Sequence, residues 1–460
     1  MPGPFLVSLL MLGGMVPPAA VPREHGGGVA QDASNIEDQF ALGVLYNDRG
    51  DFDEAIEAFS AVLAQEPELG PALANRAFAY AWTNRLAEAT RDVEMAERTR
   101  PDAASLHRVR AIIAVRRSDD ATAIAEFSRS LEQEPENPLA LRFRAALYEQ
   151  VGNHAAALAD ANAYIAAHPQ DPSGYVQKAN LLIQQHQRAL ADAEAGLLLR
   201  LFPDNVEALA SAGLIYNVLA DRSRAMAAMN EAVARDPGSF NYRHWRAGIR
   251  RWDDFTGRRA DLDAALELDP GSDRVITELG ILDLRERRWA DAIARFSTAL
   301  EGHPRDFGVL AYRAIAHLNA GDRPLAERDF HAASSAASGA SDFVSICSTF
   351  GRQGLALEWG LEMCNRALQL DGNASDYHAD RGLVELRLGR LDAALADYNL
   401  AVHADDRGAD AYYGRALVFY RRGALREAAA DRTQALALNP GIEEAFQEYG
   451  FTDFDQARSG

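Results

Sequence analysis

The sequence predicts an all-α protein built as a solenoid of helical hairpins. Three observations predict this fold: the chain repeats with a stride of 34 residues, two positions of the stride hold small residues, and Pro recurs near the end of each stride. Repeats of this length are typical of stacked units that bury a continuous core only together. Because such an array grows by adding units, 460 residues need not divide into several globular domains.

The first thirty residues differ from the rest of the chain. An apolar run, residues 5–16, is followed by two Pro and two Ala and then by a Gly-rich stretch. A run of this length suits a secretory signal and is too short to cross a bilayer, although no Lys or Arg precedes it. We therefore expect residues 1–30 to be the signal peptide of an exported bacterial protein, periplasmic or secreted. The alternative is a disordered leader on a cytoplasmic protein.

Residues 31–442 form an array of about twelve rows, of which the seventh is one residue shorter. Position 8 of the row never holds a residue larger than Ser, and position 20 is mostly Ala, so the two helices of a row can approach closely. Tyr at position 11 and Phe at position 24 fall on the buried stripes of these helices. The rows begin at Ile36, Gly70, Ala104, Pro138, Pro172, Val206, Phe240, Asp273, Phe307, Ser341, Ser375 and Ala409.

The row ends are marked by Pro and by capping residues. Position 32 holds Pro in most rows, and Pro cannot donate to a helical ladder, so the second helix ends there. Position 34 then supplies side chains suited to cap the next helix. The N-cap candidates are Asn137, Asp171, Asn205, Ser239, Ser272 and Asp306.

This pattern resembles the tetratricopeptide repeat family over nearly all of residues 36–442. The resemblance implies a right-handed superhelical solenoid of helix-turn-helix repeats. The weakest row, residues 341–374, has Gly351, Gly360 and Gly372 at three motif positions and follows an Ala/Ser stretch, which indicates a flexible joint. Residues 443–460 are expected to form a C-terminal capping helix and tail, with Phe446 and Tyr449 covering the last hairpin.

Composition and motifs restrict the function. The chain has 67 Asp plus Glu against 47 Lys plus Arg, a net charge of −20, which argues against a protein that coats nucleic acid or anionic lipid. It has no Gly-rich phosphate loop, no His-Glu-x-x-His and no Cys cluster, so we expect no catalytic site, cofactor or metal. Cys347 and Cys364 fall on facing helices of one row. We expect two buried thiols there, with a disulfide as the alternative in an exported protein.

Positions 7 and 23 carry opposite charges in the same rows, and where one is neutral the other usually is too. Only Leu279 with Arg295 departs from this rule. Side chains that change together indicate contact. We therefore predict a partly buried, structural ion pair between the two helices of each charged row. The pairs are Arg76 with Asp92, Arg110 with Glu126, Arg144 with Asp160, Lys178 with Glu194, Arg246 with Asp261, Arg313 with Asp329, Arg381 with Asp397, and Arg415 with Asp431.

The resemblance also implies a concave groove lined by positions 5, 9, 12 and 13 of each row. These positions hold eight Arg against two acidic residues, so the expected groove is basic although the protein is acidic. Arg beside aromatic residues is common in binding hot spots. The candidate groove residues are Arg108, Arg116, Arg142, Arg251, Arg285, Arg352, Arg387, Arg421, Phe78, Trp82, Trp252, Tyr413 and Tyr420.

These features favour a non-enzymatic scaffold whose groove binds a protein or peptide partner through an acidic segment or a chain-end carboxylate. In the alternative interpretation, the groove Arg residues pair with acids of neighbouring hairpins. No row combines Lys at position 5 with Asn at position 9, and only Asn75 supplies Asn at position 6, so neither chaperone docking nor glycosyl transfer is supported. Single-stranded RNA binding is the alternative function, but position 9 is mostly apolar rather than a polar code.

Overall fold

The computed structural model describes residues 36–99, 103–372 and 374–456. These residues form α-helices joined by turns, with no β-strand among them. The chain divides into two units between Ile215 and Tyr216, not at the weakest row. The predicted signal segment, residues 1–30, lies outside the described residues. No helix in the described part of the chain is long and apolar enough to cross a membrane.

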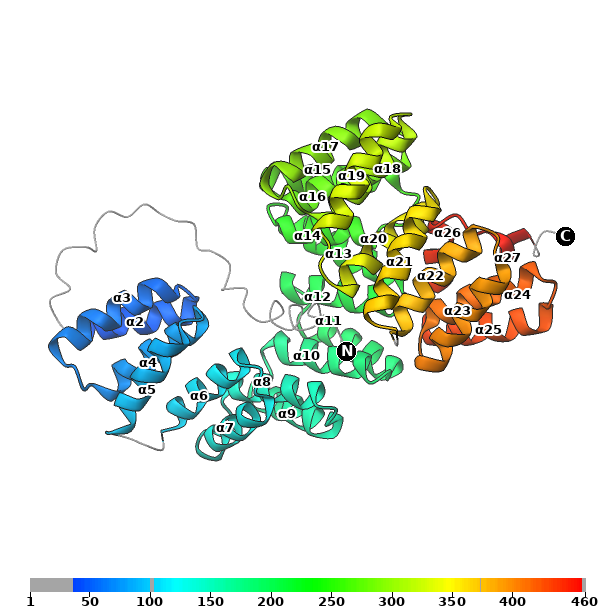
Figure 1. Ribbon diagram of the computed structural model, residues 1–460. Helices are drawn as coiled ribbons and strands as arrows, with labels where there is room; N and C mark the ends of the chain where they lie inside the picture. The colour runs from blue at the N-terminus through cyan, green and yellow to red at the C-terminus, as the bar shows by residue number, and fades with distance from the viewer. Residues whose placement is uncertain (1–35, 100–102, 373, 457–460) are drawn as a thin grey trace. The chain divides into compact units, whose positions relative to one another are not determined.

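In unit 1, each first helix packs against the second helix of its row as a hairpin, and successive hairpins stack (Figure 1). The first helix of each hairpin begins at the predicted row start. Unit 1 contains α2 (Ile36–Arg49), α3 (Phe52–Gln65), α4 (Gly70–Trp82), α5 (Leu86–Glu97), α6 (Ala104–Arg116), α7 (Asp120–Gln133), α8 (Pro138–Gln150), α9 (His154–Ala167), α10 (Pro172–Gln184) and α11 (Arg188–Leu201), and α12 (Val206–Val218) carries the boundary.

Unit 2 continues the same order of hairpins and adds two short helices at its end. Its row starts also agree with the sequence, except that α20 begins one residue early, at Ala340. The helices are α13 (Arg222–Arg235), α14 (Phe240–Ile249), α15 (Phe255–Leu268), α16 (Asp273–Arg285), α17 (Trp289–Gly302), α18 (Phe307–Asn319), α19 (Arg323–Ala336), α20 (Ala340–Gln353), α21 (Leu357–Leu370), α22 (Ser375–Arg387), α23 (Leu391–Ala404), α24 (Ala409–Arg421), α25 (Leu425–Leu438), α26 (Ile442–Glu448) and α27 (Asp453–Gln456).

The core explains why position 8 is small. A Cβ added to Gly43 would lie 2.7 Å from the ring of Phe59, and one added to Gly280 would lie 2.6 Å from the ring of Phe296. The small residue on the first helix therefore leaves room for the position-24 ring on the second. The Ala residues of position 20 are fully or almost fully buried, as in Ala55 and Ala292. This close packing of unlike side chains is what makes the hairpin a repeating unit.

Capping agrees with the sequence in part. The side chains of Asn137, Asp171, Asn205, Ser239 and Asp306 accept backbone N–H groups of the helices that follow. The prediction was wrong for Ser272, whose side chain makes no such bond. A second capping position, just before the second helix, was missed in the sequence, although it repeats at position 16. It is filled by Asp119, Asn153, Asp221, Asp254 and Asp322.

The weakest row holds a covalent link. Cys347 on α20 and Cys364 on α21 form a disulfide with their Cα atoms 5.3 Å apart, so the expectation of two thiols was wrong. Two of the three Gly residues at motif positions of this row have a packing reason. A Cβ added to Gly351 would lie 3.0 Å from Val384, and one added to Gly360 would lie 3.0 Å from Phe350.

Candidate functional site

The structure brings each predicted ion pair together across its hairpin. Arg76 Nε lies 2.7 Å from Asp92 Oδ2, and Arg144 Nη2 lies 2.7 Å from Asp160 Oδ1. Arg110 is the loosest case, 3.8 Å from Glu126 with a closer contact to Glu97. The aspartates of these pairs are at most 9% exposed. The remaining pairs are Lys178 with Glu194, Arg246 with Asp261, Arg313 with Asp329, Arg381 with Asp397, and Arg415 with Asp431.

Six of these Arg residues also tie their hairpin to the preceding one. In unit 1, Arg76 Nη1 donates to Ser60 Oγ at 3.0 Å, and Arg144 Nη1 donates to Ser128 Oγ at 2.9 Å. In each case the acceptor is a Ser or Asn at position 25 of the preceding row. This signal repeats in the sequence but was missed. The other acceptors are Asn230 for Arg246, Ser297 for Arg313, Asn365 for Arg381, and Asn399 for Arg415.

The row that begins at Asp273, which departs from the pairing rule, has its own ion cluster. Arg295, which has Leu279 where other rows have Arg, donates to Asp283 at 2.9 Å. Asp283 is fully buried and also pairs with Arg259 at 2.6 Å. It stands at position 11, where four other rows carry Tyr, so in this row the acid is on the first helix and the Arg on the second. The pairing rule fails here because the partner comes from another position.

In unit 1, the candidate groove residues form an aromatic cluster with Arg beside it. The Trp82 ring stacks on Phe52 at 5.7 Å and meets Phe78 at 6.0 Å, and the Arg116 guanidinium lies 5.3 Å from its centre. The indole Nε1 of Trp82 is buried without a hydrogen-bond partner. Arg108 pairs with Glu134 of its own hairpin, not with an acid of a neighbouring hairpin. Arg142 lies on α8, and its carbonyl accepts from Gln177 at 2.8 Å.

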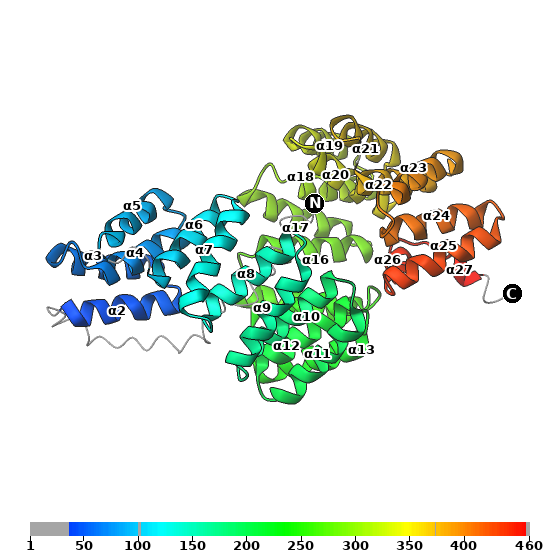
Figure 2. The same ribbon diagram turned by 90° about the horizontal axis from the view of Figure 1, so that it is seen from below.

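In unit 2, four candidate Arg residues and two Tyr residues face one stretch of chain. We name these six residues the arginine surface, and residues 442–454 the C-terminal segment. Helix α26 of this segment lies beside α24 and α25 (Figures 1 and 2). The arginine surface consists of Arg285 on α16, Arg352 on α20, Arg387 on α22, and Arg421, Tyr413 and Tyr420 on α24.

The carboxylates of the C-terminal segment pair with arginines from four helices. Glu448 pairs with Arg285, and Asp453 accepts from Arg421 at 2.8 Å. Two further pairs extend the contact beyond the arginine surface. They are Glu444 with Arg222 of α13 at 2.6 Å, and Glu443 with Arg432 of α25 at 2.5 Å.

The aromatic side chains of the segment lie on the same arginines and tyrosines. The Arg352 guanidinium lies 5.4 Å from the Tyr449 ring centre, and the Phe451 ring has Arg387 at 4.7 Å and Arg421 at 5.4 Å. Two more rings pack on tyrosines, Phe446 on Tyr413 at 4.7 Å and Phe454 on Tyr420 at 5.1 Å.

The expected capping role is therefore right for Phe446, which covers the last hairpin. Tyr449 packs against Phe446 and the same core cluster, and its ring also contacts Arg352 of α20, two hairpins earlier. Trp252 and Arg251 lie elsewhere in unit 2. Trp252 lines a pocket of about 280 Å³ beside α26, whereas Arg251 is exposed and pairs with Asp253 at 3.0 Å.

Two carboxyl groups that interact with Arg352 have raised pKa values. Burial raises the pKa of Asp380 on α22 to about 6, against the opposing effect of Arg352. Burial also raises the pKa of Asp410 on α24, again against Arg352. Burial and the nearby Arg421 lower the pKa of Arg387, whose guanidinium donates to the backbone carbonyls of Arg352 and Tyr449. Among the described residues, Arg387 has no carboxylate partner, and its Nε is buried without an acceptor.

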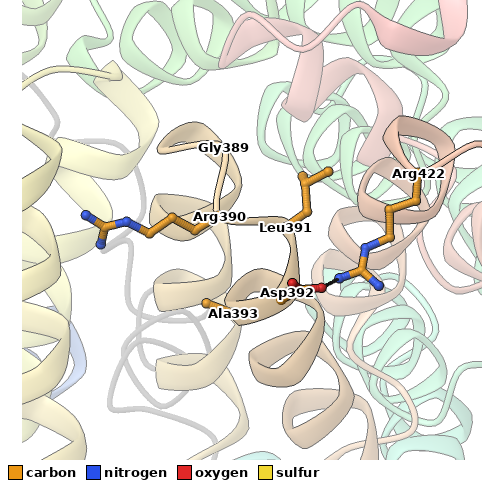
Figure 3. A pocket seen from close by; sticks show the side chains of 6 residues that line it. All are labelled: Gly389, Arg390, Leu391, Asp392, Ala393 and Arg422. Atoms are coloured by element: carbon orange, nitrogen blue, oxygen red, sulfur yellow. Dashed lines mark hydrogen bonds and ion pairs between the residues drawn. The ribbon is translucent and has the colours of Figure 1, made fainter.

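Another pocket lies at the start of α23, beside Arg422. It measures about 500 Å³ and is lined by residues 389–393 and Arg422. In Figure 3, Arg422 reaches Asp392 while Arg390 points the other way, toward its partner Glu358 at 2.7 Å. Within residues 36–99, 103–372 and 374–456, no group of three or more His, Cys, Asp or Glu is placed to hold a metal ion. The arginine surface is therefore the strongest candidate site.

Comparison with known families agrees with this architecture. A chain of stacked helical hairpins with a uniform core is a helical-repeat protein, a class of scaffolds that is typically non-enzymatic and serves protein–protein interaction. The tetratricopeptide repeat family matches residues 46–113, 108–172, 277–341, 365–408 and 379–441. The chain belongs to the tetratricopeptide repeat family.

Solved structures with a similar fold cover most of the chain. Yeast Tom70 is 14% identical, with a TM-score of 0.42 over 92% of this chain and 96% of that one. The human IFIT1 dimer with PPP-AAAA is 15% identical, with a TM-score of 0.40 over 89% and 92%. PilW, a type IV pilus biogenesis factor, is 20% identical, with a TM-score of 0.38 over 44% of this chain and 94% of that one. These likenesses concern the fold alone. No curated protein matches the chain in sequence.

Proposed function

We propose that this protein is a non-enzymatic scaffold that binds a partner polypeptide on its groove arginines and aromatic side chains. One observation supports this most: in unit 2 these side chains hold the carboxylates and rings of a polypeptide segment, as in Arg421 with Asp453 and Arg387 with Phe451. Guanidinium groups fit carboxylates through paired hydrogen bonds and lie favourably over aromatic faces. A partner segment rich in acidic and aromatic residues therefore suits the surface.

Unit 1 supports the same function. Arg116 is exposed and lies over Trp82, whose indole N–H has no acceptor. Large rings next to Arg are the side chains that dominate binding energy at interfaces. The proposed scaffold therefore has two binding regions, one in each unit.

A pull-down with three matched variants tests the function. One changes Arg108, Arg116 and Arg142 to Glu, the second changes Arg352, Arg387 and Arg421 to Glu, and both are expected to lose prey that the wild type retains. The control makes the same charge change away from the candidate positions, at the exposed Arg200, Arg305 and Arg407. If both candidate variants retain as much prey as the control, the proposed function is wrong.

Nuclease treatment separates the two functions considered for this fold. Capture of a protein is expected to survive digestion of the lysate with nuclease, because the ion pairs join two polypeptides. Loss of all captured material after digestion would favour the RNA-binding alternative, since phosphate contacts would then hold the prey.

A further inference from the structure

The C-terminal segment contacts far more than the last hairpin. Its carboxylates reach Arg222 on α13, Arg285 on α16 and Arg421 on α24, and its Tyr449 ring reaches α20. A cap needs to cover only the apolar end of a repeat array. Here instead an acidic and aromatic strip of chain lies along arginines from successive hairpins, as a bound peptide would.

We propose that the C-terminal segment, residues 442–454, is a resident ligand of the arginine surface, and that a partner polypeptide segment of the same acidic and aromatic chemistry displaces it. This inference rests on the proposed function and names the partner class and its regulation in unit 2. The resident sequence shows the pattern recognised: two carboxylates four positions apart, then Tyr, Phe and a further carboxylate. These residues are Glu444, Glu448, Tyr449, Phe451 and Asp453.

The resident segment leaves part of the surface unsatisfied. Arg387 donates to two backbone carbonyls and lies over the Phe451 ring. Within the described residues it has no carboxylate partner, and its Nε is buried without an acceptor. A buried guanidinium gains most from a charged acceptor. A partner that places a carboxylate, from a side chain or from its chain end, beside Arg387 therefore binds better than the resident sequence does.

The contacts of the segment suit release as well as binding. The arginines and carboxylates that join it to unit 2 are each about a sixth to a third exposed, so salt and water weaken these pairs. Three apolar side chains, Ile442, Phe446 and Phe451, anchor it by burial. Because the segment is tethered through the short link at Pro440, its effective concentration is on the order of millimolar or higher, and a free peptide competes poorly until the segment loosens.

One glycine allows the segment to be loosened without removing a contact. Gly450 has φ +89°, and a Cβ there would meet nothing within 4 Å. A β-branched residue is strained at this φ, so Gly450→Val should weaken the turn that returns Phe451 to the surface while leaving every arginine in place. Thr452→Val is the matched control, because Thr452 is exposed in the same segment.

The test uses the full chain and a fluorescein-labelled synthetic peptide of residues 442–454, followed by fluorescence anisotropy. We expect Gly450→Val to bind the peptide at least about tenfold more tightly than the wild type and Thr452→Val do. Adding Arg387→Glu and Arg421→Glu to Gly450→Val should abolish binding, and a peptide with Lys in place of Glu444, Glu448 and Asp453 should not bind. Equal affinity for the wild type and Gly450→Val would overturn the proposal.

Hydrogen exchange on the wild type gives an independent test that holds even if Gly450→Val does not fold. We expect the amides of α26 to exchange faster than those in the middle of α24, because a displaceable segment opens locally. Equal exchange at both places would mean that the segment opens only when unit 2 unfolds, and the proposal would be wrong. Light scattering measures whether Gly450→Val dimerises. A dimer would mean that the arginine surface binds the C-terminal segment of a second copy of the chain.

Failure of this inference can be told apart from failure of the proposed function. If the Arg108, Arg116 and Arg142 variant loses its prey but no Gly450→Val protein binds the peptide, the scaffold function stands and the segment is purely structural. If no arginine variant changes prey capture, the proposed function itself fails.

Discussion

Arg421 and Asp453 form a two-point ion pair, with Nε 2.8 Å from Oδ1 and Nη2 3.2 Å from Oδ2. The pair joins the last complete hairpin to the C-terminal segment, and Asp453 follows Arg421 by 32 residues. Two parallel N–H···O bonds fix both the distance and the orientation of the partners. The pair therefore sets where the chain lies after α26, and it offers a direct way to move that chain.

Replacing Asp453 with a cation should release the C-terminal segment, and exchanging the charges of both residues should return the segment to the arginine surface. Asp453→Arg places two cations together, so we expect faster hydrogen exchange in residues 449–454. Arg421→Asp combined with Asp453→Arg should return most of the protection. Because both side chains are partly exposed, the coupling energy should be about 1 kcal/mol. Absence of coupling between the two substitutions would show that the pair does not hold the segment.

The inter-helix ion pairs should behave as units. Asp160→Ala leaves Arg144 partly buried with only Ser128 as a partner, so we expect a loss of about 3 kcal/mol in stability. Arg144→Leu with Asp160→Ala should recover most of that loss, because Leu42 and Ala58 already fill these positions in the first row. Thermal melts followed by circular dichroism measure both. A double variant no more stable than Asp160→Ala would contradict the structural role.

The disulfide should stabilise the weakest row. The bond closes a loop between residues 17 apart, which in the chain-entropy description is worth about 3 kcal/mol. We expect Cys347→Ser to lower the melting temperature of the oxidised protein. A reductant should lower the melting temperature of the wild type and leave Cys347→Ser unchanged. Mass spectrometry of the alkylated, unreduced protein checks the bond itself, since two labelled thiols would show that the bond does not form.

The buried carboxyl of Asp380 should make stability depend on pH. Burial raises the pKa of Asp380 to about 6 from an ordinary value of 3.8, and the charged groups that act on it are Arg352, Asp410 and Asp376. The folded protein therefore binds this proton more tightly than the unfolded chain does. The stabilisation from the neutral carboxyl is present below about pH 4 and is lost as the pH rises through about 6.

Asp380→Asn removes that titration and gives the matching experiment. The variant and the wild type should melt at similar temperatures at pH 4, where the wild-type carboxyl is neutral. At pH 7.5 the variant should melt at the higher temperature, because it keeps no buried carboxylate. A difference between the two proteins that is the same at both pH values would contradict the raised pKa.

Much of the fold could be predicted because the same side-chain packing and the same ion pairing recur in each row. Gly43 and Gly280 are small because the rings of Phe59 and Phe296 occupy the adjacent space. Repetition also identified ion partners such as Arg313 and Asp329, since a change at one position is matched at the other in the same row. The same reasoning failed for Arg295, whose partner Asp283 stands at position 11 and not at position 7.

The candidate site was predicted only in part. The sequence named Arg285, Arg352, Arg387 and Arg421 but not what they touch, because their partners follow the last row and have no repeat to reveal them. Glu444 lies 222 residues from Arg222, and no spacing rule connects two such residues. Asp380 and Asp410 were missed because their raised pKa values come from desolvation in the tertiary structure, which no spacing along the chain reveals.

The sequence by itself determined the helical hairpins, their boundaries and the pairing of charges within them, because those contacts join residues less than one row apart and recur. Only the tertiary structure decided that Cys347 meets Cys364 as a disulfide and that residues 442–454 cover the arginine surface. The physical reason is distance along the chain. Contacts within one hairpin join residues that are near in sequence, and they recur in each row. The position of the C-terminal segment instead depends on the accumulated rotation of the hairpins from α13 to α25.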